Sequence, residues 1–178
     1  MNKKIKKLLL KKNKSKIICL TAYSKNVRLE IKKSLMVVDM PYNTYKNSKE
    51  ALKNAKLLMK KTKCDAVKLE GGKKIVPIIK DLIKNKIPVM GHLGILPQTD
   101  KKFTFKGKRF SERHKILKDA EMLESAGIFS VVLECVETKL AKMISSKLKI
   151  PTIGIGSSNN CDGQVLVIDD LIGLNNSN

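Results

Sequence analysis

Four short apolar runs in this chain end in an ionisable residue. They are MVVDM with Asp39, AVKLE with Glu70, PVMGH with His92 and SVVLE with Glu134. In α/β barrels and doubly wound sheets, residues at the carboxyl ends of parallel strands face one shared crevice, where ligands bind and chemistry occurs. The repeated pattern therefore predicts that these four side chains meet in one active site.

The carboxylates of the first two runs could bind a metal ion. Asp39 and Glu70 on neighbouring strands would supply hard oxygen ligands of the kind that Mg²⁺ prefers, with water and substrate oxygens completing its coordination. Lys68 lies two residues before Glu70 and projects from the same face of the strand, so Glu70 could also be its partner. A structural ion pair at the strand end, or a turn-forming Asp39, is the alternative for these residues.

The other two runs carry candidate acid–base groups. His92 stands between two glycines in GHLG and could donate a hydrogen bond or a proton near neutral pH, although a histidine that only orders its loop fits equally well. Glu134 ends an apolar strand and could act as a general base, or it could simply reach solvent. Gly71 and Gly72 could cradle a phosphate, but two glycines are more typical of a tight turn.

Elements that could position these groups alternate along the chain. Apolar runs predict strands at 17–22, 35–40, 66–69, 88–92, 129–134, 151–155 and 165–168, and helical spacing predicts helices from Ser48 onward and at 75–86, 111–125 and 138–148. Such alternation predicts βαβ units with a parallel sheet covered by helices. We expect a (β/α)8 TIM-barrel type fold, incomplete with about seven strands, forming a single domain over residues 1–178. An open dinucleotide-binding sheet is disfavoured because no glycine-rich fingerprint follows the first strand.

The strongly basic composition says little about the function. The formal net charge is +21, but all except three of the 37 basic residues are lysine, aromatic residues make up 4%, and there is no tryptophan. Nucleic-acid recognition favours arginine and aromatic stacking, so a solvated lysine-rich surface is the better interpretation. The four cysteines form no metal-binding spacing, and no apolar run is long enough to span a membrane. We expect a soluble, cytoplasmic protein with reduced cysteines.

The runs also stand in the order of a known family. VVDMPYNTY, AVKLEGG, PVMGHLGILPQ, VVLECVETKLAK and IPTIGIGSSNNCDGQVLVIDDLIGL together closely resemble ketopantoate hydroxymethyltransferases, over residues 16–174. The resemblance implies a (β/α)8 barrel that binds Mg²⁺ and forms homo-oligomers. It also implies transfer of a one-carbon unit from 5,10-methylenetetrahydrofolate to an α-keto acid, in the first step of pantothenate synthesis.

The resemblance further implies a role for each candidate residue. Asp39 would be a Mg²⁺ ligand that contacts the substrate, and Glu70 would support the metal directly or through water. Lys68 would hold the carboxylate or keto oxygen of the substrate, and Glu134 would accept the proton from carbon. His92 would line the same pocket.

The chain departs from the family in its second strand and near its end. The family's Asp-Ser motif, which supplies another Mg²⁺ ligand, is missing, and Ser24 stands where an Asp commonly follows TAY. Thirteen residues lie between Tyr23 and Val37, too few for a strand with flanking helices. The sequence stops at Asn178, so the closing helices are also expected to be absent. Two alternatives therefore stay open: a non-catalytic remnant of the enzyme, and a lysine-rich nucleic-acid binder.

Overall fold

The computed structural model of the chain describes residues 2–21, 33–102, 104–168 and 173. Strands and helices alternate in it, as the sequence pattern predicts. In chain order the elements are α1 (Lys3–Leu9), β1 (Ile17–Leu20), β2 (Val37–Asp39), α3 (Ser48–Thr62), β3 (Ala66–Glu70), the 3-10 turn η1 (Lys73–Ile75), α4 (Val76–Lys84), β4 (Val89–Gly94), α5 (Phe110–Ser125), β5 (Ser130–Glu134), α6 (Thr138–Lys147), β6 (Thr152–Ile155) and β7 (Gly163–Leu166).

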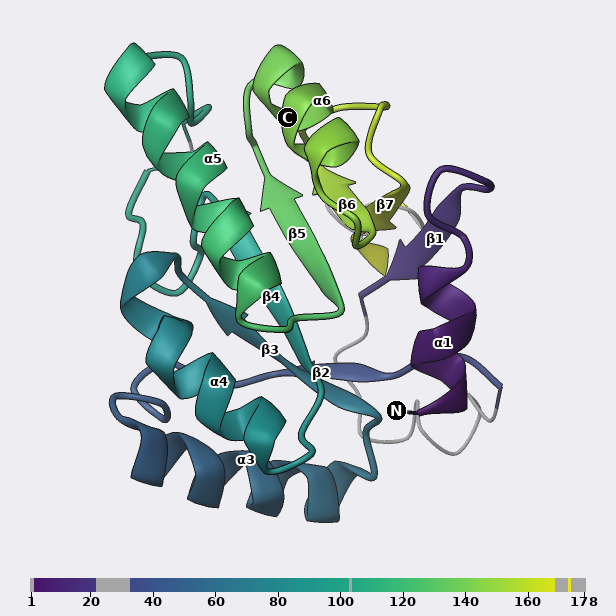
Figure 1. Cartoon of the computed structure of the whole chain (residues 1–178), viewed down its shortest axis with the longest axis vertical. Coiled ribbons are helices and arrows are strands. Elements are labelled where there is room, and N and C mark those ends of the chain that lie inside the picture. The colour runs from purple at the N-terminus through teal and green to yellow at the C-terminus, as the bar shows by residue number, and fades with distance from the viewer. Residues whose placement is uncertain (1, 22–32, 103, 169–172, 174–178) are drawn as a thin grey trace.

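The strands form one parallel sheet that curls into a half-barrel (Figure 1). Its order is β1-β7-β6-β5-β4-β3-β2, so β1 and β2 are the outer strands within the part of the chain that the structure describes. A closed barrel would need a further strand to join these two edges. The incomplete barrel of about seven parallel strands is therefore confirmed for the described residues, with its two edges at β1 and β2.

Alternation of side chains divides the core into two layers. On the convex face, Val67 and Leu69 of β3 belong to a large cluster with helices α3 to α6. On the concave face, Ala66 and Met90 belong to a smaller cluster that also contains Ile5 of α1. Because β-strand residues alternate between faces, Lys68, Glu70 and His92 must share the concave side with Ala66 and Met90.

Local signals set most element boundaries, and the structure corrects a few of them. The N-cap of α3 is Asn47, not Ser48, and its side chain accepts a hydrogen bond from Glu50 N at 2.9 Å. Gly127 follows α5 with φ +99°, the left-handed conformation expected of a C′ glycine.

Three expected segments differ from the observed ones. The first strand ends at Leu20, and Ala22 lies outside the described residues. Ser24 and most of the thirteen residues between Tyr23 and Val37 also lie outside them. The helix expected at 75–86 is a 3-10 turn followed by α4, because Pro77 is accommodated in the first turn of α4. The last strand begins earlier than expected, at Gly163. No helix within the described ranges is long and apolar enough to cross a bilayer.

Candidate active site

All five candidate side chains come from the concave face at the carboxyl ends of four neighbouring strands. The register pairs Asp39 with Lys68 between β2 and β3, Glu70 with His92 between β3 and β4, and Gly94 with Glu134 between β4 and β5. Parallel pairing at these positions brings the tips together, as the sequence predicts. The five side chains fall into two groups along the edge of the sheet.

The first group is an ion pair at the open side of the half-barrel. Lys68 Nζ lies 3.1 Å from Asp39 Oδ2, and the Asp39 side chain is 56% exposed. The sequence suggested Glu70 as the partner of Lys68, but Asp39 occupies that position because it is directly opposite in the register. Asp39 keeps free lone pairs toward solvent, so it can bind a further cation or donor.

The second group is a buried histidine between two carboxylates. His92 Nε2 lies 3.2 Å from Glu134 Oε2, and Nδ1 lies 3.7 Å from Glu70 Oε1. The histidine is 1% exposed, yet neither ring nitrogen makes a hydrogen bond with any group that the structure describes. Because buried polar atoms are rarely left unpaired, such an imidazole is typical of a functional site.

The pKa of Glu70 is raised above its ordinary value, because burial outweighs the lowering effects of His92, the Gln98 N–H and Lys68. Its Oε2 accepts a hydrogen bond from Gln98 N at 3.1 Å. Gln98 belongs to the GHLGILPQ segment, but its position in that motif indicated no role for it. The contact with a carboxylate of the site now marks it as a residue that sequence reasoning missed.

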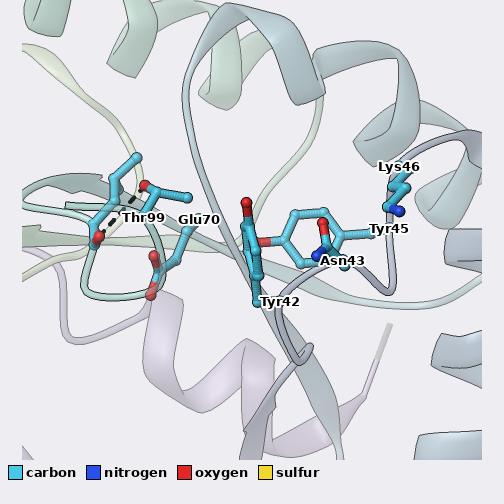
Figure 2. A pocket seen from close by; sticks show the side chains of 7 residues that line it. Tyr42, Asn43, Tyr45, Lys46, Glu70 and Thr99 are labelled. Atoms are coloured by element: carbon cyan, nitrogen blue, oxygen red, sulfur yellow. Dashed lines mark hydrogen bonds between the residues drawn. The ribbon is translucent and has the colours of Figure 1, made fainter. Parts of the chain in front are cut away.

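A hollow of about 200 Å³ opens beside Glu70. Tyr42, Tyr45 and Thr99 line it together with Glu70 (Figure 2). Tyr45 is fixed there because its hydroxyl donates to Gln98 Oε1 at 3.0 Å. Aromatic walls beside a few polar groups are typical of a small-molecule site. The sequence carried no signal for this pocket, because its tyrosines lie in the loop after β2 and the strand-end pattern covers only the last residue of each strand.

The backbone around Glu134 is unusually constrained. Cys135 has φ +48°, which is uncommon for a residue with a side chain, and its N–H donates to Ile155 O at 2.9 Å. Gly94 has φ +98°, and a Cβ at that position would overlap the carbonyl oxygen of Glu134. Together these features fix where β5 ends and hence where the Glu134 side chain projects. Cys135 itself is half-buried.

Gly71 and Gly72 form a turn and not a phosphate cradle. The carboxylate of Asp119 occupies the space beside Gly72, and its Oδ1 accepts a hydrogen bond from Lys73 N at 2.9 Å. An anion already fills the position where a phosphate would bind at the start of η1.

The donors available to a divalent cation are few but of a suitable type. The residues that the structure describes contain no group of three or more His, Cys, Asp or Glu side chains that could hold a metal ion. Mg²⁺ commonly keeps several waters and takes only one or two carboxylates from the protein. Asp39, with Glu70 acting through water, therefore fits Mg²⁺ provided that substrate and water oxygens complete the shell.

A curled parallel sheet with carboxylates, a lysine and a histidine at the carboxyl ends of its strands is the arrangement of a barrel enzyme. The family model for ketopantoate hydroxymethyltransferase matches residues 20–178. The chain therefore belongs to the ketopantoate hydroxymethyltransferase family.

Individual relatives agree with this assignment. A 3-methyl-2-oxobutanoate hydroxymethyltransferase from Pelagibacter ubique is 57% identical over 217 aligned positions, which cover 98% of this chain and 84% of the relative. Enzymes of the same name from Bacteroides thetaiotaomicron and Chlorobium phaeobacteroides are each 46% identical over 86% of this chain, which spans 58% and 57% of their lengths.

The alignment with the Pelagibacter protein is longer than this chain. Its 217 positions exceed the 178 residues of this chain, so the relative carries residues within the aligned region that this chain lacks. Among solved structures, FabK from Thermotoga maritima has a TM-score of 0.46 and 14% identity, covering 81% of this chain and 47% of that chain. That likeness is too low to bear on the site.

Proposed function

We propose that the chain transfers a hydroxymethyl group from 5,10-methylenetetrahydrofolate to 3-methyl-2-oxobutanoate and forms 2-dehydropantoate. The family assignment supports the reaction type. The observation that carries the proposal at the level of residues is the buried contact between His92 and Glu134, 3.2 Å apart. It gives Glu134 a neighbour that can stabilise it as a carboxylate and exchange a proton with it.

Each side chain has a role in this reaction. Lys68 binds the carboxylate or keto oxygen of the substrate, after exchanging its contact with Asp39 for one with the ligand. Glu134 removes the proton from C3, and His92 orients Glu134. Mg²⁺, held by Asp39 and through water by Glu70, would polarise the keto oxygen as a Lewis acid. Water cleaves the two C–N bonds of the folate methylene bridge, and tetrahydrofolate leaves with both nitrogens protonated. The C3 electron pair forms the C–C bond to the released one-carbon unit, whose oxygen comes from water and takes a proton back from Glu134.

The proposed setting follows from the same family assignment. The protein acts as a homo-oligomer in the cytoplasm, with an α-keto acid and a folate as its small-molecule partners and no nucleic acid. Retention on RNA or DNA at about 0.15 M salt, with a steep salt dependence, would instead favour the lysine-rich nucleic-acid binder.

The test is formation of 2-dehydropantoate by the purified chain, with Mg²⁺ and folate each omitted in turn. Glu134→Gln is nearly isosteric and should lower kcat by about 10²–10⁴-fold, since it removes a general base. Glu50→Gln, on the exposed first turn of α3, is the matched control and should leave the rate unchanged.

A second candidate function is favoured by one observation, the missing Asp-Ser motif. If the wild-type chain forms no more product than Glu134→Gln, the chain is a non-catalytic remnant of the enzyme and the proposal is wrong.

A further inference from the structure

Gln98 lies at the centre of a hydrogen-bond hub in the loop that follows β4. Its side-chain Nε2 donates to Met40 O at 2.9 Å, its backbone N donates to Glu70 Oε2 at 3.1 Å, and its Oε1 accepts from the Tyr45 hydroxyl at 3.0 Å. One residue thus contacts the end of β2, the end of β3 and the wall of the pocket in Figure 2.

The loop that carries Gln98 is itself ordered by local contacts. The backbone N–H groups of Thr99 and Asp100 donate to Leu96 O at 2.9 and 2.8 Å, and Asp100 Oδ2 accepts from Leu96 N at 3.1 Å. These contacts order the backbone from which the Gln98 side chain projects. The hub is therefore built on a turn that has its own hydrogen bonds.

Of the two groups to which Gln98 donates, one is the carboxylate of Glu70 and the other is the backbone carbonyl of the residue that follows Asp39. Met40 directly follows Asp39 and is 1% exposed, so the hydrogen bond to its carbonyl fixes the peptide that ends β2. Glu70 is held directly, because its carboxylate oxygen Oε2 accepts the hydrogen bond from Gln98 N. Within the described part of the chain, no other residue donates a hydrogen bond to both of these groups.

We infer that Gln98 is a positioning residue that sets Asp39 and Glu70 relative to each other across the ends of β2 and β3. The consequence for catalysis rests on the proposed function, but the positioning itself does not. Gln98 touches neither His92 nor Glu134 by hydrogen bond, so it acts on the rest of the site through Glu70, whose Oε1 faces His92 Nδ1 at 3.7 Å.

The competing explanation is that Gln98 only stabilises its loop. The chain provides a matched control, because Gln98 and Gln164 are its only glutamines. Gln164 Nε2 donates to Ser158 O at 2.8 Å, a bond of the same type on β7. Replacing either glutamine by methionine keeps the length of the side chain and removes the amide.

The experiment compares Gln98→Met with Gln164→Met in three measurements. These are the thermal midpoint, the ¹⁵N signals of the imidazoles at fixed pH, and the affinity for Mn²⁺ as a probe of the metal site. The chain has only two histidines, and the exposed His114 is an internal reference for His92. We expect Gln98→Met to move the His92 signals and to weaken Mn²⁺ binding by about 10–100-fold, as for other residues that orient metal ligands.

A purely structural role predicts a different result. If both variants lower the thermal midpoint while His92 signals and Mn²⁺ affinity stay at wild-type values, the inference is wrong. Should Gln98→Met fail to fold, Tyr45→Phe replaces it: losing the hydroxyl must shift the side-chain amide of Gln98 and not that of Gln164. A wild-type chain that binds no Mn²⁺ would count against the metal part of the proposed function, and the His92 signals would still decide the role of Gln98.

Discussion

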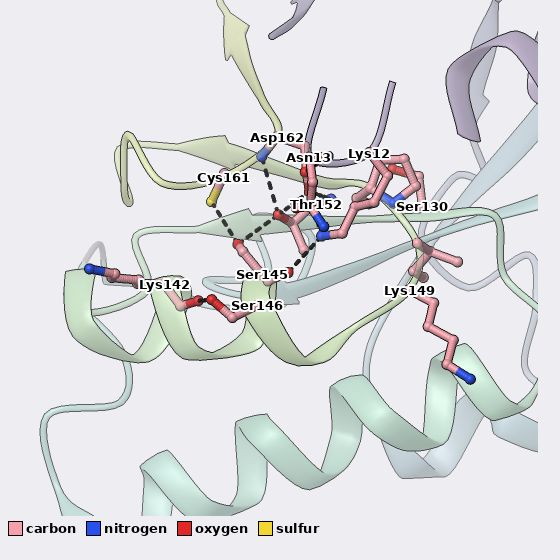
Figure 3. A network of polar contacts seen from close by, with 12 residues as sticks. Lys12, Asn13, Ser130, Lys142, Ser145, Ser146, Lys149, Thr152, Cys161 and Asp162 are labelled. Atoms are coloured by element: carbon pink, nitrogen blue, oxygen red, sulfur yellow. Dashed lines mark hydrogen bonds and ion pairs between the residues drawn. The ribbon is translucent and has the colours of Figure 1, made fainter. Parts of the chain in front are cut away.

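Replacing Lys12 by methionine should destabilise the protein far more than replacing a lysine on its surface. Lys12 Nζ donates to Asp162 Oδ2 at 2.8 Å and to Ser145 O at 2.6 Å, and the two charged side chains are only 9% and 5% exposed (Figure 3). Asp162 also accepts hydrogen bonds from Thr152 N, Thr152 Oγ1 and Asn13 N, at 2.8, 3.0 and 3.1 Å. Methionine keeps most of the alkyl chain and removes the charge together with both hydrogen bonds of the ammonium group.

The expected loss follows from the burial of the aspartate that stays behind. Removing one partner of a buried ion pair costs about 3–5 kcal/mol, because the other charge is left without compensation. The hydrogen bonds that Asp162 retains from Thr152 and Asn13 place the loss near the lower end, about 3 kcal/mol. For a chain of this size that corresponds to a fall in Tm of about 6–12 °C.

Urea unfolding at neutral pH measures this loss, with Lys147→Met as the control. Lys147 pairs with Glu121 on the surface, where both side chains are more than a third exposed, so its loss should be below about 1 kcal/mol. A loss below about 1 kcal/mol for Lys12→Met as well would refute the reasoning, since it would mean that Asp162 is solvated without its lysine.

The pH dependence gives a second check with a defined sign. Burial raises the pKa of Asp162, but hydrogen bonds from Lys12, Thr152 N and Asn13 N outweigh it and hold the pKa below its ordinary value. A folded pKa below the unfolded one stabilises the protein above about pH 4, and that stabilisation disappears as the pH falls through the folded pKa. The difference between wild type and Lys12→Met should therefore narrow below about pH 4.

Two further substitutions test the constrained backbone around Glu134. Gly94→Ala should destabilise the protein and lower activity together, because its Cβ would overlap Glu134 O in a φ +98° conformation; a Tm within about 1 °C of wild type would contradict this. Cys135→Gly should be tolerated within about 1 kcal/mol at φ +48°, whereas Cys135→Val should cost about 1–3 kcal/mol, and equal Tm values for the two variants would argue against strain at that position.

The strand-end pattern was enough to predict the fold and the meeting of the candidate residues. Apolar runs of strand length between amphipathic helices allow few arrangements other than a parallel sheet with its tips at one edge. Asp39, Glu70, His92 and Glu134 therefore needed no long-range information to be placed together. That the described sheet has about seven strands was also predictable, since the residues between Tyr23 and Val37 are too few for another βα unit.

Pairing within the site could not be predicted, because it depends on register. Lys68 and Glu70 share a strand face, which suggested that they pair, but residues two apart on a strand are about 6.6 Å apart, whereas neighbouring strands are about 4.8 Å apart. Asp39 is directly opposite Lys68 in the β2–β3 ladder and forms the ion pair. Gln98 was hidden for a related reason: it lies in a loop, and only the closed turn after β4 brings it to Glu70.

The N-terminal segment contacts the sheet near both of its outer strands in the described part of the chain. Lys4 contacts Asp65 at 3.1 Å, just before β3 and beside the outer strand β2, and Lys12 contacts Asp162, just before β7 and beside the outer strand β1. The segment therefore binds both sides of the opening at the end of the sheet opposite the candidate site, while Ile5 fills the concave core between them. At that end, the ion pairs of Lys4 with the half-buried Asp65 and of Lys12 with the buried Asp162 attach the segment to the sheet. The candidate site lies at the other end, where the described residues provide no such bridge and Asp39 stays mostly exposed.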